Sequence, residues 1–405
     1  MHVHRSGNLL LSSSEGDEKM RLVIVSLSYF VPKKASVETY LEVIAKGFKD
    51  EDVHVVALSD RTEDRVGRWG EKIHLINTDH GIKISHIGIF NPFIWSWMLH
   101  KKIAELNPDV VITGEIHITG LAAALQTFLH KSKSIITVTG DYEQEKHNWW
   151  KGSKIGWFYE GMYDAMEWMT LHFANHFVSN GRHVHEFMVK KAGAGRCTLS
   201  FGSTEPDRFI FDEKTRKKVR GKRLANKKVV GFIGNFLDRD GIMEAIDIID
   251  GLHKKDESYH LLVLGDGPLK KDVVGRKEGR GLNDAITLLG WVPHDEVPPY
   301  LMACDVVIFP MKQPQCGLSM AALEAMSLMV PIITTDVGDM KELIDGDKTG
   351  FLTGNTVESM ISWVEHFFAL PESDRNTMGI LARKLILEKF SDERMIKDFR
   401  KVING

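Results

Sequence analysis

A short loop and the helix after it carry the residues whose types and spacing best suit chemistry. Gly317 lies where the helix is expected to begin, and a glycine lets the backbone approach a ligand closely. The free N–H groups at a helix start attract anions, so we expect a phosphate near Gly317, Leu318 and Ser319. Glu324 lies further along the same helix, too deep for a phosphate, and its carboxylate suits a diol such as the hydroxyls of a ribose.

The elements around this loop are predicted from the apolar pattern. The runs Asp305–Phe309 and Pro331–Thr335 predict two strands, which flank a polar loop at Gln313–Ser319 and a helix at Met320–Leu328. A strand, a loop, a helix and a second strand in this order form one unit of a parallel sheet. The loop therefore follows the carboxyl end of a strand, which is where such sheets bind ligands.

This unit resembles the donor site of the retaining glycosyltransferases of family 4, which have the GT-B fold. Glu324, Ala325 and Met326 match the second of two glutamates in that family and its neighbours. The first glutamate, eight positions earlier, touches the donor sugar in the family, and Cys316 stands there instead. The match continues through Pro331, Thr334, Asp336, Val337, Gly338 and the run Glu342–Ile344.

The resemblance also places a diphosphate next to the loop that begins at Gly234. The family has an arginine directly after this glycine and a lysine before the last glycine of the loop, but Asn235 and Asp240 stand there. Arg239 and Lys312 are the nearest candidate replacements. Without such cations the site is poorly suited to a diphosphate, because a buried dianion needs positive partners.

Two further loops complete the expected donor site. The turn Gly265–Pro268 (GDGP) resembles a turn close to the donor in the family, although glycines alone explain a tight turn. Trp291 and Val292 follow the next strand, where the family holds the nucleobase; Trp291 either stacks on the base or packs between the sheet and the next helix. The donor-binding residues implied are Gly234, Asn235, Gly265, Gly267, Trp291, Val292, Cys316, Gly317, Leu318, Ser319, Met320 and Glu324.

The run Asp238-Arg239-Asp240 has the spacing of a manganese motif from a different glycosyltransferase fold. Aspartates are common in polar turns, and we interpret this run as a turn. The resemblance implies transfer without a metal ion or cofactor, with the nucleotide-sugar as co-substrate.

On the acceptor side, Asp141 matches the aspartate of a His–Asp pair in the family, but Gly140 stands in place of the histidine. His117, which follows a neighbouring strand, is a candidate replacement. A single histidine at a strand end is more often structural or solvent-facing than catalytic. The catalytic residues proposed at this stage are Asp141, His117, Arg239 and Lys312.

The composition is that of an ordinary soluble protein, with 43% hydrophobic and 26% charged residues among 405. A net charge of −3 gives no support to a nucleic-acid partner. Three scattered cysteines indicate neither a disulfide framework nor a zinc site and favour a cytoplasmic location. No run reaches the roughly 18 apolar residues of a membrane span.

Short apolar runs alternate with helical patterns through the whole chain, which predicts an α/β protein with two doubly wound parallel sheets. Helices are expected, among others, at Met98–Leu106, Leu121–Leu129 and Asp392–Ile403. The basic stretch 202–228 is expected to be a solvated connection. The predicted parts are a disordered extension (1–19), an acceptor-side domain (20–206), a donor domain (207–385) and a final segment (386–405) that packs back on the first domain.

Aromatic residues lie next to lysines in the first half of the sequence. One cluster spans Phe90–Lys102, and a second spans His147–Trp168. Tryptophan beside lysine is typical of a helix in a membrane interface, although an aromatic core with solvated lysines is an equal alternative. Contact with the cytoplasmic face of a membrane is therefore one hypothesis.

The sequence as a whole favours a retaining glycosyltransferase that moves a sugar from a nucleotide-sugar to a glycan or lipid-linked acceptor. Two alternatives remain open: a degenerate relative that binds a nucleotide or a partner without turnover, and a nucleotide-sugar epimerase on the same two-domain frame.

Overall fold

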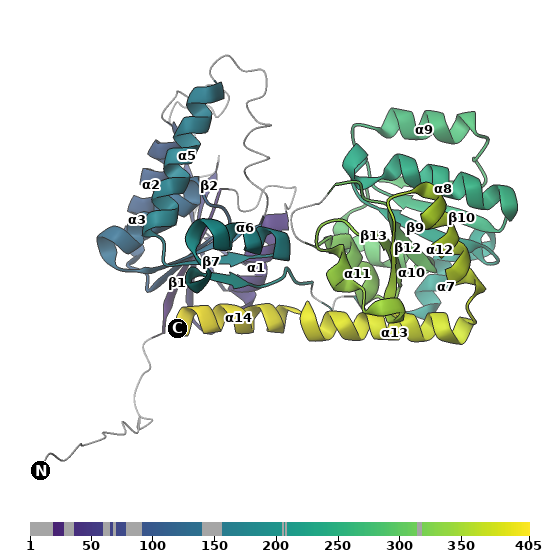
Figure 1. The fold of residues 1–405 in the computed structure, drawn as a ribbon. Coiled ribbons are helices and arrows are strands. Elements are labelled where there is room, and N and C mark those ends of the chain that lie inside the picture. The colour runs from purple at the N-terminus through teal and green to yellow at the C-terminus, as the bar shows by residue number, and fades with distance from the viewer. Residues whose placement is uncertain are drawn as a thin grey trace, which may run out of the picture.

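The computed structural model describes residues 19–27, 36–59, 65–67, 70–77, 91–139, 156–204, 206, 209–313 and 318–405. Two domains, each built on a parallel sheet with helices on both faces, are joined by short segments and by a long pair of helices (Figure 1). No helix in this described part of the chain has the length and apolar character needed to cross a bilayer.

The N-terminal domain has an eight-stranded sheet in the order β3-β4-β2-β1-β5-β6-β7-β8. All its neighbouring strands are parallel except the short pair β3 and β4. The strands are β1 Arg21–Ser26, β2 Asp52–Ser59, β3 Arg65–Val66, β4 Lys72–Asn77, β5 Val110–Thr113, β6 Lys133–Val138, β7 His176–Ser179 and β8 Cys197–Leu199. The helices are α1 Ser36–Gly47, α2 Asn91–Leu106, α3 Ile118–His130, α5 Gly156–Phe173 and α6 Arg182–Ala192.

Burial on both faces explains why the central strands are continuous apolar runs. Leu22 and Ile24 of β1 pack into one hydrophobic cluster, and Val23 and Val25 pack into the other. Two helices begin earlier than the sequence pattern predicts. Helix α2 starts at Asn91, with a proline in its first turn, a position that proline tolerates. Helix α3 starts at Ile118, because Glu115 accepts hydrogen bonds from its first amides.

The C-terminal domain has a six-stranded, fully parallel sheet in the order β11-β10-β9-β12-β13-β14. Its strands are β9 Lys228–Ile233, β10 Tyr259–Leu264, β11 Ile286–Gly290, β12 Val306–Phe309, β13 Ile332–Thr335 and β14 Gly350–Thr353. Its helices are α7 Glu213–Leu224, α8 Ile242–Lys255, α9 Lys270–Gly279, α10 Val297–Ala303, α11 Met320–Ser327, α12 Val357–Ala369 and α13 Glu372–Lys389.

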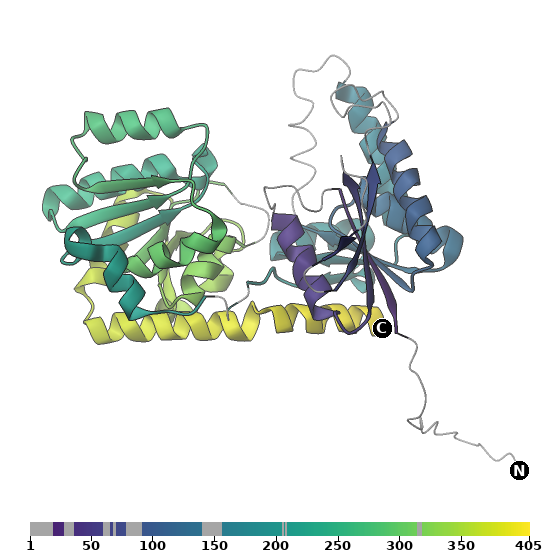
Figure 2. The same ribbon diagram turned by 180° about the vertical axis from the view of Figure 1, so that it is seen from behind.

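The final helix, α14 (Asp392–Asn404), leaves the C-terminal domain and packs against α1 of the N-terminal domain (Figure 2). Met395 and Phe399 lie in the N-terminal core beside Tyr40. The Ser203 hydroxyl donates to Asp392 at 2.8 Å, which ties this crossing to the other segment between the domains.

We expected the basic stretch 202–228 to be a solvated connection. This expectation is wrong in part, because the stretch contains α7. Asp212 caps this helix by accepting hydrogen bonds from the amides of Lys214 and Thr215. Arg216 and Arg220 then point inward and pair with Asp305, so part of the basic charge is compensated inside the domain. The inward face of α7 carries arginines that pair with Asp305 in place of apolar residues. The sequence therefore shows no apolar period there, and the helix was not predicted.

Candidate functional site

Three loops at the carboxyl ends of β9, β10 and β11 lie side by side and are joined through their backbones. The amide of Gly234 donates to Leu264 at 3.1 Å, and that of Gly265 donates to Gly290 at 2.9 Å. The expected donor loops are therefore neighbours at one edge of the sheet, where α/β proteins bind ligands.

Glycine is required in the turn after β10 by close packing. A Cβ on Gly265 would lie 1.9 Å from the Gly234 carbonyl oxygen, and one on Gly267 would lie 2.8 Å from the Phe236 amide nitrogen. Gly265 also has a φ of +145°, which side chains rarely adopt. A Cβ on Gly265 would also lie 3.3 Å from the ring of the buried Phe236. The turn thus holds two loops together without a side chain between them.

Helix α11 carries the buried carboxylate of the site. Leu318 and Ser319 precede it and are buried, and Met320 begins it. Ser319 is at the N-cap, but its side chain makes no capping hydrogen bond, so the first amides of α11 have no cap from this residue. Glu324 lies further along the helix, 5% exposed, and Oε1 is 2.7 Å from Nε2 of His294. Cys316 and Gly317 lie outside the described residues.

Sequence reasoning did not identify His294. It lies four residues beyond the end of β11, in the short 3₁₀ turn His294–Glu296, and its ring packs edge-on against Phe209. Its contact with Glu324 spans 30 positions in the sequence. The only signal was a polar residue just after the loop that contains Trp291 and Val292.

Trp291 is 72% exposed, so the alternative in which it packs between the sheet and the next helix is wrong. Val292, by contrast, packs against the core of the domain. The loop therefore presents an open indole face at the same sheet edge as Gly265.

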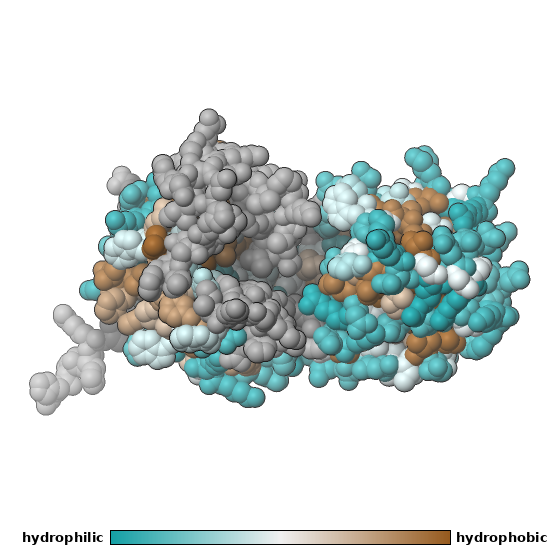
Figure 3. Space-filling view, turned by 90° about the horizontal axis from the view of Figure 1, so that it is seen from above, coloured by the Kyte–Doolittle hydropathy of each residue, from teal (hydrophilic) through white to brown (hydrophobic). Residues whose placement is uncertain are grey.

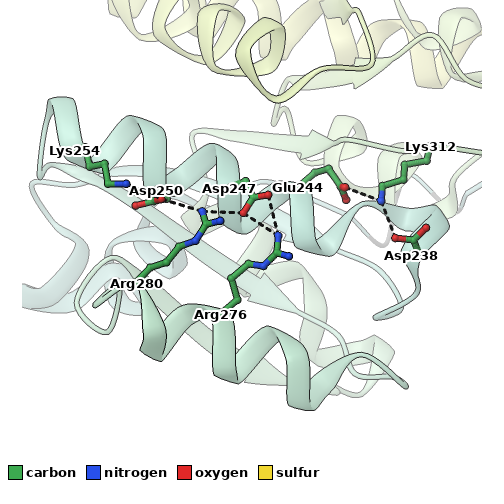
Figure 4. A network of polar contacts seen from close by, with 8 residues as sticks. All are labelled: Asp238, Glu244, Asp247, Asp250, Lys254, Arg276, Arg280 and Lys312. Carbon is green, nitrogen blue, oxygen red and sulfur yellow. Dashed lines mark hydrogen bonds and ion pairs between the residues drawn. The ribbon is translucent and has the colours of Figure 1, made fainter.

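The two candidate cations are neighbours in space, since the Lys312 amide donates to the Arg239 carbonyl at 3.0 Å. The Lys312 ammonium lies 2.7 Å from both Asp238 and Glu244. Figure 4 shows it at one end of a row of ion pairs along α8, in which acidic side chains contact Arg276 and Arg280. Burial alone lowers the pKa of Lys312, but the two carboxylates raise it above its ordinary value.

Arg239 belongs to the 3₁₀ turn Asp238–Asp240, as the turn interpretation of this run requires. Its side chain is half exposed, with Nε 3.8 Å from the buried Asp240 carboxylate. Among the described residues, no group of three or more His, Cys, Asp or Glu side chains is placed to hold a metal ion. Asn235 lies two residues beyond the end of β9, and its carbonyl accepts a hydrogen bond from the Leu237 amide at 2.9 Å.

In the N-terminal domain, His117 is buried at the start of α3 and packs edge-on against Tyr163. Its Nδ1 lies 3.7 Å from Oε2 of Glu115. Burial raises the pKa of Glu115, although the amides that it caps lower it. Burial, with the charge of Glu115, raises the pKa of Tyr163 to about 12. His117 was expected to be catalytic, structural or solvent-facing. Because it is buried, the solvent-facing alternative is wrong. Asp141 lies outside the described residues.

The two domains also touch directly. Arg182, at the start of α6, pairs with Glu342 at 2.7 Å. The next amide, that of His183, donates to Asp339 at 3.4 Å, and burial raises the pKa of Asp339. Acidic residues of the C-terminal domain therefore cap a helix of the N-terminal domain, at which a negative charge is favoured.

Comparison with known proteins places this geometry in context. Residues 227–368 match the family described as Glycosyl transferases group 1. The chain is 25% identical over 169 residues to an alpha-D-kanosaminyltransferase of Streptomyces kanamyceticus, which covers 42% of this chain and 43% of that protein. It is 25% identical over 190 residues to a GDP-mannose-dependent alpha-(1-6)-phosphatidylinositol monomannoside mannosyltransferase of Mycobacterium tuberculosis, with 45% and 49% covered. Each match thus spans less than half of the relative's length.

Among solved structures, the chain is similar to the HepE protein of Anabaena in complex with UDP. The TM-score is 0.74, with 15% identity, and the alignment covers 95% of this chain and 99% of that one. This likeness extends over both domains and shows the fold.

Proposed function

We propose that this chain, which has the GT-B fold and whose residues 227–368 form a glycosyl transferases group 1 domain, is a glycosyltransferase. It moves a sugar from a nucleotide-sugar donor to a glycan or a lipid-linked acceptor, with retention at the anomeric carbon. The observation that carries this proposal is the buried carboxylate of Glu324, held by His294 beside the close-packed loops of the sheet edge.

In this proposal Glu324 binds the ribose. A carboxylate accepts hydrogen bonds from two neighbouring hydroxyls, and in a buried site such bonds are strong. His294 engages Oε1, which fixes the orientation of the carboxylate and leaves Oε2 for a hydroxyl. Trp291 offers an exposed indole face for the base. The nearby backbone at Gly234, Gly265 and Gly290 allows the nucleotide a close approach.

The diphosphate lies near the start of α11 in this proposal, where amides and the helix dipole favour an anion. Of the two candidate cations, Arg239 contacts fewer carboxylates of the described residues, because it lies near Asp240 alone whereas Lys312 contacts Asp238 and Glu244. Amides and a cation stabilise the departing nucleoside diphosphate without a metal ion. The N-terminal domain, with His117 and Asp141, serves the acceptor.

An exposed aromatic surface on the N-terminal domain supports the proposal of a lipid-linked acceptor. We define the outer aromatic surface as Trp97 of α2, Phe128 of α3 and Trp157 and Trp168 of α5, all of which are exposed. Phe128 packs on Phe173, which connects α3 to α5. In Figure 3, hydrophobic residues gather on the outer side of this domain. We propose a cytoplasmic protein that touches the membrane through this surface. Of the other clustered aromatic residues, Phe93 and Trp95 pack against the core of the domain, whereas Phe90 and those at 147–150 lie outside the described residues.

A second candidate is a protein that binds a nucleotide without turnover. The double contact of Lys312 with carboxylates favours it, because little unmatched positive charge remains for a diphosphate. The experiment that separates the two is a thermal-shift screen with UDP, GDP, ADP and their sugars, followed by a transfer assay with any donor that binds. Binding with transfer supports the enzyme, binding without transfer supports the binder, and no binding contradicts both.

A further inference from the structure

A cavity of about 690 Å³ lies at the amino ends of the strands of the C-terminal sheet, whereas the donor loops lie at the carboxyl ends. Asp305 and Pro331, which line it, come directly before β12 and β13, whereas the donor loops follow the ends of their strands. Its other walls are α7 and the first half of α13. The cavity and the candidate donor site are therefore separate.

Two guanidinium groups in the cavity share one carboxylate. Arg216 and Arg220, 23% and 13% exposed, place Nη2 at 2.5 Å and 2.7 Å from the same oxygen of Asp305. The other Asp305 oxygen accepts from the Val229 amide at 2.8 Å. Although Arg220 Nη2 is buried and close to Asp305, it completes no hydrogen bond with the described residues. The pair thus has more positive charge and more donors than Asp305 can match.

The rest of the lining combines polar and apolar groups. Lys217 and Arg375 bring the cationic side chains to four, against three carboxylates from Asp305, Glu213 and Glu372. Lys217 lies 3.7 Å from Glu213, and both side chains are exposed, so this ion pair is weak. Asn376 adds an amide, and the apolar part of the lining includes Phe211, Met329, Pro331, Phe367 and Ile380.

We propose that this cavity binds a small phosphate ester. Its phosphate contacts the cationic side chains of the lining, since the planar fork of arginine matches phosphate oxygens. These side chains are Arg216, Arg220, Lys217 and Arg375. Its organic part lies against Phe211 and Ile380. The volume is within the range of about 300–1,000 Å³ found for small-molecule sites.

The position of the cavity gives its ligand a structural effect. Helix α7 is the first helix after the chain enters this domain, and α13 is the last before it leaves (Figures 1 and 2). A ligand that touches both helices joins the helix that follows the chain's entry into this domain to the helix that precedes its exit. Bound ligand therefore raises the melting temperature of the whole chain.

The test measures thermal shift and calorimetric affinity with inorganic phosphate, glucose 6-phosphate and glucose at constant ionic strength. Because Arg216 and Arg220 also hold Asp305, the test variant is Lys217→Gln with Arg375→Gln. We expect glucose 6-phosphate to stabilise the wild type and to bind this double variant about tenfold or more weakly, the scale of a lost charged hydrogen bond.

Two controls make the result specific. Arg276→Gln removes an arginine from an ion pair elsewhere in the domain, and Glu324→Gln alters the donor site; both are expected to keep the wild-type affinity for glucose 6-phosphate. A shift of equal size with glucose, no shift with either phosphate probe, or equal affinity in the double variant and the wild type would each overturn the proposal. Loss of binding in Glu324→Gln would place the phosphate ester in the donor site, which also overturns it.

Discussion

Nε2 of His294 lies 2.7 Å from Oε1 of Glu324, and this contact joins the loop after β11 to helix α11. The carboxylate side chain is only 7% exposed, whereas the imidazole is 52% exposed. A buried acceptor is therefore oriented by a partner that a ligand in solvent can reach. We propose that this arrangement lets a carboxylate deep in an apolar helix bind a ligand at the sheet edge.

Replacing Glu324 by glutamine tests the ribose assignment. We expect nucleotide binding to weaken by about 1–3 kcal/mol, because the amide loses a charged hydrogen bond while the fold survives. Calorimetry with the nucleotide selected in the donor screen gives the affinity. Glu358→Gln, an exposed position in the first turn of α12, is the control and should bind like the wild type. Equal affinity in Glu324→Gln and the control would remove Glu324 from the site.

The role of His294 is tested by a double-mutant cycle with Glu324→Gln. If His294 acts by orienting Glu324, His294→Ala should weaken nucleotide binding in the wild type but have little further effect in Glu324→Gln. The coupling energy should be about 0.5–3 kcal/mol, the range for residues in contact. Additive losses in calorimetry would show that the imidazole acts on the ligand independently of Glu324.

Much of the fold could be predicted from the sequence, because buried parallel strands are continuous apolar runs. The fold class and the strand–loop–helix unit around Glu324 follow from such runs. Strand β4 was missed because Lys72 and His74 interrupt its pattern, and these polar residues are there to pair with Asp52 and His54 on β2. Strand β14 was missed because it begins with a glycine and its apolar run is only Phe351 and Leu352.

The site was predicted less completely, since spacing gives residue types but not partners. The sequence placed the glycine loops after strands and Glu324 in an apolar helix, and the resemblance implied that both bind the donor. The pairing of Glu324 with His294, and of Lys312 with Asp238 and Glu244, joins residues 30 or more positions apart or on different elements. Those contacts decide the charge of the site, and only the fold reveals them.

Membrane contact predicts binding to anionic vesicles. The outer aromatic surface carries Lys101, whose ammonium lies 5.7 Å from the Trp97 ring, so attraction should fall as salt screens it. Replacing Trp157 and Trp168 by serine should lower the bound fraction severalfold in sedimentation at low salt, because indole rings favour the interface. Trp291→Ser, an exposed tryptophan on the other domain, is the control. Absence of pelleting by the wild type at low salt would contradict the proposal.

Acid should weaken the junction between β1, β2 and β4. The hydrogen bond from Lys72 holds the pKa of Asp52 well below its usual range, and Arg21 and His54 add to the effect. A lowered pKa means that the stabilisation is present above the unfolded value of about 4 and is lost as the pH falls through the folded value. Asp52→Asn should therefore cost about 1 kcal/mol at neutral pH and progressively less below about pH 4.

Urea unfolding at several pH values measures this difference. The control is Asp50→Asn, an exposed neighbour, which should match the wild type throughout. A gap between Asp52→Asn and the wild type that stays constant from neutral pH to pH 3 would contradict the assigned ion pairs.

The proposed diphosphate site of the donor is tested by the variants Arg239→Ala, Lys312→Ala and their combination. A departing nucleoside diphosphate needs positive charge as well as amide donors. If the chain is an active transferase, at least one of these neighbouring cations must reach the diphosphate. Removing that cation should lower the transfer rate by roughly 10²-fold or more, the scale of losing one stabilising donor. Affinity for a nucleoside without phosphates should hardly change, because the contacts to ribose and base remain.

The ion pairs of Lys312 make it possible to distinguish the contribution of Lys312 to diphosphate binding from that of Arg239. Asp238→Asn with Glu244→Gln removes both carboxylates that hold the ammonium, so Lys312 becomes available to the diphosphate. We expect this variant to bind the nucleoside diphosphate more tightly than the wild type and to bind the nucleoside equally, in calorimetry at fixed ionic strength. Arg276→Ala, in the same row of ion pairs but on α9, is the control. A wild type that transfers sugar at the rate of the Arg239→Ala/Lys312→Ala variant would contradict the proposed phosphate site, because neither cation would then face the leaving group.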